Sequence, residues 1–167
     1  DFYVSGWCKD QECSSGWTDT SFTTDEACTT KFKYVINSIT DTSFAVWWRL
    51  PEGAEYGEME YGLAGTSEGE GTFIGPVYPD ADTVCRVSVT GLHAGTYYTV
   101  RIRNLCTYRS AYSEWQTTGV TTIAYHTVSA VPNNPQWGST SGSGQYLEGT
   151  SVTLSATPAN EYCRFIS

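Results

Sequence analysis

The feature that most constrains this chain is an alternating segment that occurs twice. Residues 91–122 begin with a Gly-rich turn and continue with apolar side chains at every second position from Tyr98 to Ile102, separated by Thr and Arg. This alternation predicts a β-strand with one buried face, and the Thr-rich stretch that follows predicts the second strand of a hairpin. Residues 1–24 align with residues 99–122 without a gap, at an offset of 98 residues.

This repeat predicts the length of a module. Copies at this spacing indicate units of about 100 residues, so the 167-residue chain has room for one whole unit. We expect residues 1–27 to be the C-terminal hairpin of one module, 28–123 to be a complete module, and 124–167 to be a partial third unit. The matched positions are Phe2 with Val100, Val4 with Ile102, Cys8 with Cys106, Ser15 with Ser113, Trp17 with Trp115, and Thr23-Thr24 with Thr121-Thr122.

The amino-acid composition favours an all-β fold. Aromatic residues make up 14% of the chain, Thr, Ser and Gly are abundant, and no long run of helix formers has helical spacing. The alternation predicts six or seven strands, spaced as in a β-sandwich. Trp48 is expected in the core, with Trp47 facing outward beside it. The expected strands before the hairpin cover residues 31–37, 43–50, 56–62, 72–78 and 84–90.

The order of features in residues 28–123 resembles a fibronectin type III domain, which implies an immunoglobulin-like β-sandwich. In that family the last tyrosine of the turn closes a corner with its hydroxyl group on the backbone, which implies this role for Tyr98. Ala94 stands where the family usually has proline. The matching motifs are Ile39-Thr40, Trp48, Glu60-Tyr61-Gly62 and Leu92-His93-Ala94-Gly95-Thr96-Tyr97-Tyr98.

The cysteines favour disulfides in an oxidising compartment. Six cysteines without a CxxC pair, together with two histidines, argue against a metal site. The positions of Cys28 and Cys106 resemble a bacterial variety of the family, common in secreted and surface proteins of Bacteroides-like organisms, and this resemblance implies that they pair. Pairing of Cys85 with Cys106 is the alternative, because both side chains should point inward. The other assignments are Cys8 with Cys13 and no evident partner for Cys163.

Residues 124–167 differ in composition and are rich in Gly, Ser, Thr and Pro. They resemble the bacterial surface repeat related to the internalin B repeat. We expect a strand from Tyr125, a Gly/Ser turn, a short strand, a turn at Glu148-Gly149 and an alternating strand over residues 152–156, together forming a partial, weakly packed module. The matching stretches are Gln145-Tyr146-Leu147-Glu148-Gly149-Thr150 and Val152-Thr153-Leu154 through Pro158.

The sequence contains no catalytic constellation. His93 lies in the structural turn and His126 at a module junction, and HExxH and phosphate-binding glycine motifs are absent. The glycines of residues 67–72 precede no helix, so we expect a flexible loop. Two pairs of carboxylates lie on polar loops and should be solvated, with weak calcium binding at the second pair as the alternative. The pairs are Glu68 with Glu70 and Asp80 with Asp82.

One tryptophan is expected to have a structural role. The stretch from Tyr112 to Gln116 resembles a relaxed WSxWS box of cytokine-receptor fibronectin domains, which implies that Trp115 stacks on outward-facing arginines of the neighbouring strand. These arginines are Arg101 and Arg103. The acids expected to face outward on the third strand and pair with them are Glu58 and Glu60.

Two other tryptophans, Trp47 and Trp137, are the candidate ligand-binding residues, with a glycan as the first ligand to consider. The formal charge of −9 disfavours nucleic acid and anionic membranes, since the nine Lys and Arg residues are dispersed. No apolar run approaches the roughly 20 residues that span a bilayer.

We therefore expect no enzyme, cofactor or metal ion. The sequence favours a non-catalytic spacer and interaction segment, of the adhesion type, within a larger secreted or cell-surface bacterial protein. Its partners would be the neighbouring modules and an extracellular protein or glycan. The alternative is an accessory, glycan-binding module of a secreted hydrolase or protease.

Overall fold

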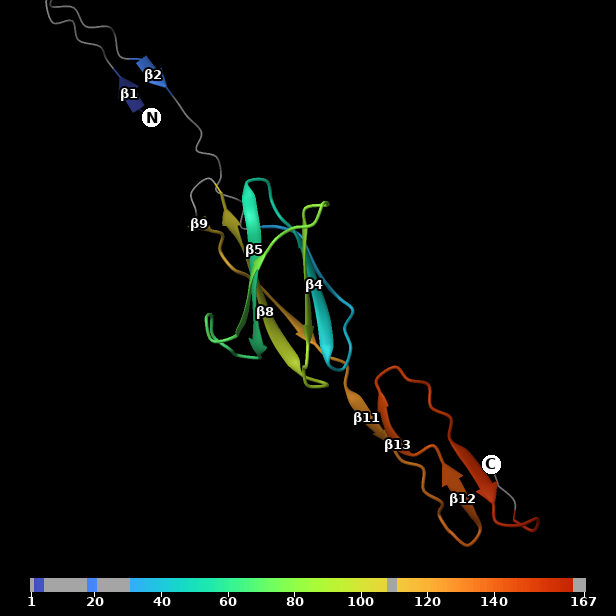
Figure 1. Ribbon diagram of the computed structural model, residues 1–167. Coiled ribbons are helices and arrows are strands. Elements are labelled where there is room, and N and C mark those ends of the chain that lie inside the picture. Colours follow the sequence, from blue (N-terminus) through green and yellow to red (C-terminus); the bar gives the residue numbers. More distant parts are fainter. Residues whose placement is uncertain (1, 5–17, 21–30, 108–110, 164–167) are drawn as a thin grey trace, which may run out of the picture.

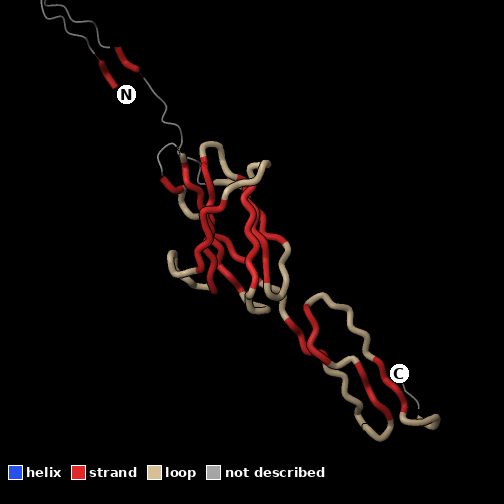
Figure 2. The backbone as a smooth tube through the Cα atoms, viewed as in Figure 1, coloured by secondary structure: helices blue, strands red, loops and turns tan. Residues whose placement is uncertain are grey.

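The computed structural model describes residues 2–4, 18–20, 31–107 and 111–163. Strands and loops make up these ranges, and none of their residues is helical (Figures 1 and 2). Accordingly, no helix that could cross a membrane is found in them.

Residues 31–107 and 111–123 form a β-sandwich of two antiparallel sheets. One sheet has the strand order β3-β4-β7, and the other has the order β10-β8-β5-β6 with β9 paired to β8. This is the strand arrangement of a fibronectin type III domain, so the expected fold class is confirmed. The first sheet consists of β3 (Tyr34–Asn37), β4 (Ser43–Arg49) and β7 (Val84–Thr90). The second consists of β5 (Ala54–Leu63), β6 (Thr72–Val77), β8 (Tyr97–Cys106), β9 (Ala111–Tyr112) and β10 (Gln116–Thr121).

The core lies between the inner faces of the two sheets, where alternate side chains of each strand meet. Trp48 is 1% exposed and its Nε1 donates a hydrogen bond of 3.0 Å to Asn104 Oδ1, which satisfies the buried indole. Gly57 lies directly against this ring, since a Cβ there would lie 2.4 Å from it. The other core residues are Phe44, Val46, Leu50, Met59, Cys85, Val87, Val89, Leu92, Tyr98, Val100, Ile102 and Val120.

The turn before β8 is closed by the tyrosine that the resemblance identifies. The hydroxyl of Tyr98, a residue only 5% exposed, accepts a 3.0 Å hydrogen bond from the backbone N–H of His93. Thr122 Oγ1 donates to the His93 carbonyl at 2.6 Å and accepts from the Thr96 N–H at 3.0 Å. These side chains satisfy backbone groups that the turn leaves without sheet partners, so Ala94 in place of proline leaves the corner closed.

The N-terminal hairpin reproduces the pairing of the sandwich hairpin. Strands β1 (Phe2–Val4) and β2 (Thr18–Thr20) are antiparallel. Val4 pairs with Thr18, just as Ile102 pairs with Gln116 at an offset of 98 residues. The two segments therefore share a register as well as a sequence pattern. Cys8, Cys13 and Cys28 lie outside the described residues.

The C-terminal unit consists of two separate two-stranded sheets. Strand β11 (Tyr125–Val128) pairs with β13 (Gly144–Leu147), and β12 (Gly138–Ser141) pairs with β14 (Ser155–Pro158). The turn at Glu148-Gly149 is present, closed by the Thr150 N–H on the Leu147 carbonyl at 3.0 Å. None of the described side chains from 124 to 163 is fully buried, so the unit lacks a core of its own in this range.

The alternating strand expected at residues 152–156 is wrong in position. The strand lies at Ser155–Pro158, where it pairs with β12, a strand that the sequence pattern did not predict. Alternation locates a strand when one of its faces is buried. Here backbone pairing sets the position instead, since Leu154 is 51% exposed.

Replacing Tyr98 with phenylalanine tests the corner. Tyr98→Phe removes the acceptor of the part-buried bond from the His93 N–H, and losing this bond should lower the free energy of unfolding by about 1 kcal/mol. The matched control is Tyr97→Phe, because Tyr97 is 50% exposed and should change stability by no more than about 0.5 kcal/mol. Urea unfolding followed by tryptophan fluorescence measures both, and equal losses would contradict the assigned role.

Candidate functional site

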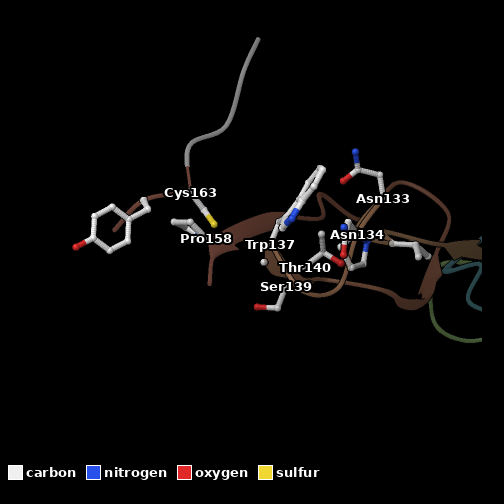
Figure 3. A pocket seen from close by; sticks show the side chains of 11 residues that line it. Asn133, Asn134, Trp137, Ser139, Thr140, Pro158 and Cys163 are labelled. Carbon is white, nitrogen blue, oxygen red and sulfur yellow. The ribbon is translucent and has the colours of Figure 1, made fainter. Parts of the chain in front are cut away.

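A cleft of about 770 Å³ opens in the C-terminal unit around Trp137 (Figure 3). It lies between the loop that joins β11 to β12, the start of β12, the end of β14 and residues 162–163. The described residues that line it carry no formal charge at neutral pH. They are Val131, Pro132, Asn133, Asn134, Trp137, Gly138, Ser139, Thr140, Pro158, Tyr162 and Cys163.

Backbone hydrogen bonds fix Trp137 on both sides. Its N–H donates to the Asn134 carbonyl at 3.1 Å, and its carbonyl accepts from the Ala159 N–H at 2.9 Å. The next residue, Gly138, lets the strands approach closely, because a Cβ there would lie 2.5 Å from the Thr157 carbonyl oxygen. The Trp137 side chain is nevertheless 61% exposed. A flat ring is thus held at the mouth of the cleft by a constrained backbone.

The polar side chains of the cleft keep unused hydrogen-bonding groups. Asn134 Oδ1 accepts from the Gln136 N–H at 2.9 Å, which leaves its amide NH₂ group free of any bond to the described residues. Thr140 Oγ1 donates to the Ala130 carbonyl at 2.8 Å and can still accept. The Asn133 amide makes no hydrogen bond within the described part of the chain. Figure 3 shows it on the same side of the chain as the Trp137 ring.

The second candidate, Trp47, is already partly covered. Its side chain is 40% exposed on the outer face of β4, and the guanidinium of Arg86 lies 4.6 Å from the ring centroid. Arg86 Nε in turn bonds Asp80 Oδ2 at 2.8 Å. One face of the Trp47 ring is therefore engaged by a cation–π contact, and Trp47 is not among the residues that line the Trp137 cleft.

Asp80 serves the turn before β7. Its Oδ1 accepts from the backbone N–H groups of Asp82 at 2.9 Å and Val84 at 3.0 Å. The Val84 N–H first, and Arg86 second, hold the pKa of Asp80 below its ordinary value. Both carboxylate oxygens are engaged within the protein. No group of three or more His, Cys, Asp or Glu residues that could hold a metal ion occurs in residues 2–4, 18–20, 31–107 and 111–163.

Arg103 stacks between two rings on the outer face of the larger sheet. Its guanidinium carbon lies 4.3 Å from the Trp115 ring centroid and 3.9 Å from that of Tyr112. It also bonds Glu58 Oε2 at 2.7 Å. The predicted pairing of Glu58 with an outward-facing arginine is confirmed. Arg103 and Tyr112 cover the carboxylate, which leaves Glu58 only 5% exposed.

The hydroxyl groups of two tyrosines complete this cluster. Tyr112 OH donates to Glu58 Oε1 at 3.0 Å and lies 3.2 Å from the Tyr56 hydroxyl. The hydrogen bond with Tyr56 first, and that with Glu58 second, raises the pKa of Tyr112 above its ordinary value. All the polar groups named here are engaged with one another, which indicates a structural cluster.

Arg101 has another role than the one expected from the WSxWS resemblance. No stacking of Arg101 on a described ring occurs. Its guanidinium bonds Glu60 Oε1 at 3.5 Å and the carbonyls of Thr66 and Ser67, the latter also at 3.5 Å. Arg101 thus ties the loop between β5 and β6 to the sheet.

The glycine-rich part of that loop, expected to be flexible, is bound to a buried carboxylate. Glu60 pairs with the outward-facing Arg101, as predicted, and is only 2% exposed because the loop covers it. It accepts from the Gly69 N–H at 3.0 Å and from the Gly71 N–H at 2.8 Å. A Cβ at Gly71 would lie 2.7 Å from Glu60 Oε1. The sequence pattern missed this site because the anion comes from the neighbouring strand.

The state of the described cysteines excludes one of the two predicted pairings of Cys106. Cys85 is buried and free, and burial raises the pKa of its thiol to about 11. Cys106 is disulfide-bonded. The alternative pairing of Cys85 with Cys106 is therefore wrong. Cys163 is also free, so no disulfide joins two described cysteines, and the pairing of Cys28 with Cys106 stays a prediction.

Replacing Glu60 with glutamine tests the loop contact. Glu60→Gln leaves Arg101 without its partner charge and removes an acceptor from the glycine amides. It should lower the free energy of unfolding by about 3 kcal/mol, on the scale of breaking a buried pair. Glu70→Gln is the matched control, since Glu70 is exposed on the same loop. Faster amide hydrogen exchange at Gly69 and Gly71 in the first variant alone is expected, and unchanged exchange would refute the contact.

The comparisons with known proteins yield structural neighbours alone. No protein-family model matches the chain, and no curated protein matches it. A computationally redesigned β-sandwich protein has a TM-score of 0.45 and 23% identity, covering 55% of this chain and 90% of that one. The FN1–FN3 domains of chicken CNTN1 give 0.44 and 13%, covering 53% and 28%. The sensor domain of the anti-sigma factor RsgI4 of Pseudobacteroides cellulosolvens gives 0.38 and 18%, covering 56% and 95%.

Proposed function

We propose that this chain is a non-catalytic spacer and interaction segment of a larger secreted or cell-surface bacterial protein. The observation that carries the proposal is the junction between the sandwich and the C-terminal unit. Strand β10 ends at Thr121 and β11 begins at Tyr125. The two units thus follow one another without a flexible linker and extend the molecule lengthwise (Figure 1).

Hydrogen bonds fix the short connection on both sides. The Ile123 N–H donates to the Thr40 carbonyl at 2.9 Å, while the Ile123 carbonyl accepts from the Gly95 N–H at 3.1 Å. On the other side, the Glu148 N–H donates to the Ala124 carbonyl at 2.9 Å. A connection whose backbone groups are bonded to both units resists bending, as a spacer requires.

One side-chain bond spans the junction directly. Tyr125 OH donates to Asp41 Oδ2 at 3.0 Å, from the first strand of the C-terminal unit to the loop before β4. This bond favours the protonated tyrosine, so the Asp41 carboxylate raises the pKa of Tyr125 above its ordinary value of 10.0. The bond therefore contributes below pH 10 and is lost as the pH rises through the raised pKa.

Two further observations support an array in an oxidising compartment. The shared register of the two hairpins supports tandem modules of the fibronectin type III kind. The proposal that an internalin B-like repeat follows them rests on the sequence match from Gln145 to Pro158. The disulfide-bonded state of Cys106 supports secretion or surface display. In such an array the partners would be neighbouring modules and an extracellular protein or glycan.

Replacing Tyr125 with phenylalanine tests the rigid junction. In the native protein, residual dipolar couplings from residues 31–123 and from residues 124–163 should fit one alignment tensor. Tyr125→Phe removes the bond to Asp41 and should reduce the order of the second set relative to the first. Tyr162→Phe is the control, because Tyr162 is 86% exposed and distant from the junction in the sequence. Independent tensors in the native protein would refute the spacer proposal.

A further inference from the structure

We propose that the Trp137 cleft binds an uncharged saccharide. The cleft, of about 770 Å³, is of the size that ligand pockets have. This inference adds a ligand to the non-catalytic role proposed above. It stands on the cleft alone, so it can fail while the rigid spacer holds.

The charge of the lining restricts the class of ligand. The chain carries a formal charge of −9, yet no Asp, Glu, Lys or Arg is among the described residues that line the cleft. A phosphate or carboxylate ligand would lack a counter-ion there and would be repelled by the acidic protein around it. A cationic ligand would lack a carboxylate partner. The cleft therefore suits a neutral molecule.

The shape and chemistry of the lining favour a sugar among neutral molecules. A sugar ring has an apolar C–H face that packs on a flat aromatic ring, and hydroxyl groups at its edge. The Trp137 ring is 61% exposed and supplies the flat surface. The amides of Asn133 and Asn134, with their uncommitted donors, supply edge contacts beside it. Amide groups both donate and accept, which matches a hydroxyl group.

The constrained backbone of Trp137 lowers the entropic cost of binding. The residue is bonded through its N–H to Asn134 and through its carbonyl to Ala159. A backbone that is fixed before the ligand arrives loses little further freedom when the ligand binds. Trp47 differs, because the Arg86 guanidinium already lies 4.6 Å from its ring and Trp47 is not among the residues that line the cleft. This difference makes Trp47 a matched control.

The competing neutral ligand is a proline-rich peptide in an extended conformation. Such peptides dock in grooves lined by several aromatic side chains. This cleft offers Trp137 and Tyr162 as its aromatic residues, and the second is 86% exposed. Its free amide groups favour a hydroxyl-rich partner, so we assign the sugar and make the peptide an arm of the test.

The experiment titrates the ¹⁵N-labelled protein with maltohexaose, cellohexaose, mannohexaose and N-acetylchitohexaose, and in a separate arm with decaproline. At least one saccharide should shift the indole N–H of Trp137 and the side-chain amides of Asn133 and Asn134 in a saturable way. Trp137→Ala should weaken that binding by about tenfold or more, as removal of a central aromatic anchor does. Trp47→Ala should leave the affinity unchanged.

Three outcomes would overturn the assignment. They are saturable binding by decaproline alone, the absence of saturable binding by all four saccharides, and saccharide binding that Trp137→Ala does not weaken. If Trp137→Ala alters the backbone amide spectrum of β12 and β14, Asn133→Ala decides instead, because its exposed side chain makes no hydrogen bond within the described residues. That variant should weaken binding with the spectrum of the unit intact. The dipolar couplings across the junction report separately on the spacer.

Discussion

The sandwich depends on strand β8, along which inward apolar side chains alternate with outward polar ones. Its inward side chains, Tyr98, Val100 and Ile102, are at most 5% exposed and form the centre of the core. Its outward side chains include Arg101 and Arg103, whose charges lie over the larger sheet. Hydrophobic burial on one face brings these cations to fixed positions on the other, and they need partners there. The register between β8 and β5 supplies them.

That register places a glutamate directly opposite each arginine. Arg103 pairs with Glu58 and Arg101 with Glu60. Each ion pair is then covered, one by the ring of Tyr112 and the other by the glycine loop. Burying a carboxylate costs free energy unless its oxygens accept hydrogen bonds. Here the Tyr112 hydroxyl donates to Glu58, and the glycine amides donate to Glu60. The loop conformation thus follows from the charge pattern of two strands.

Alternation in the sequence was enough to locate the strands that bury one face. Strand β7 covers Val84–Thr90 and agrees with the predicted residues 84–90. The burial of Glu60 could not be predicted, because it depends on a loop that begins only after β5 ends and folds back over it. The alternating pattern also misplaced β14. Alternation marks a strand only where one face is buried, and no described side chain of residues 124–163 is fully buried. The assignment of Trp137 to a cleft likewise required the structure, because its lining comes from segments up to residue 163.

The sandwich and the C-terminal unit therefore differ in how far their polar groups are bonded within the protein. The sandwich pairs Arg101 and Arg103 with glutamates and satisfies the Trp48 indole internally, while the buried Trp115 Nε1 has no hydrogen-bond partner among the described residues. The C-terminal unit buries no described side chain fully and keeps free amides beside an exposed ring. Because these amide groups make no bond within the unit, they are available to a ligand, provided that contacts with the sandwich hold the unit in place. The bonded junction at residues 122–125 supplies that support, which connects the rigid sandwich to the open cleft.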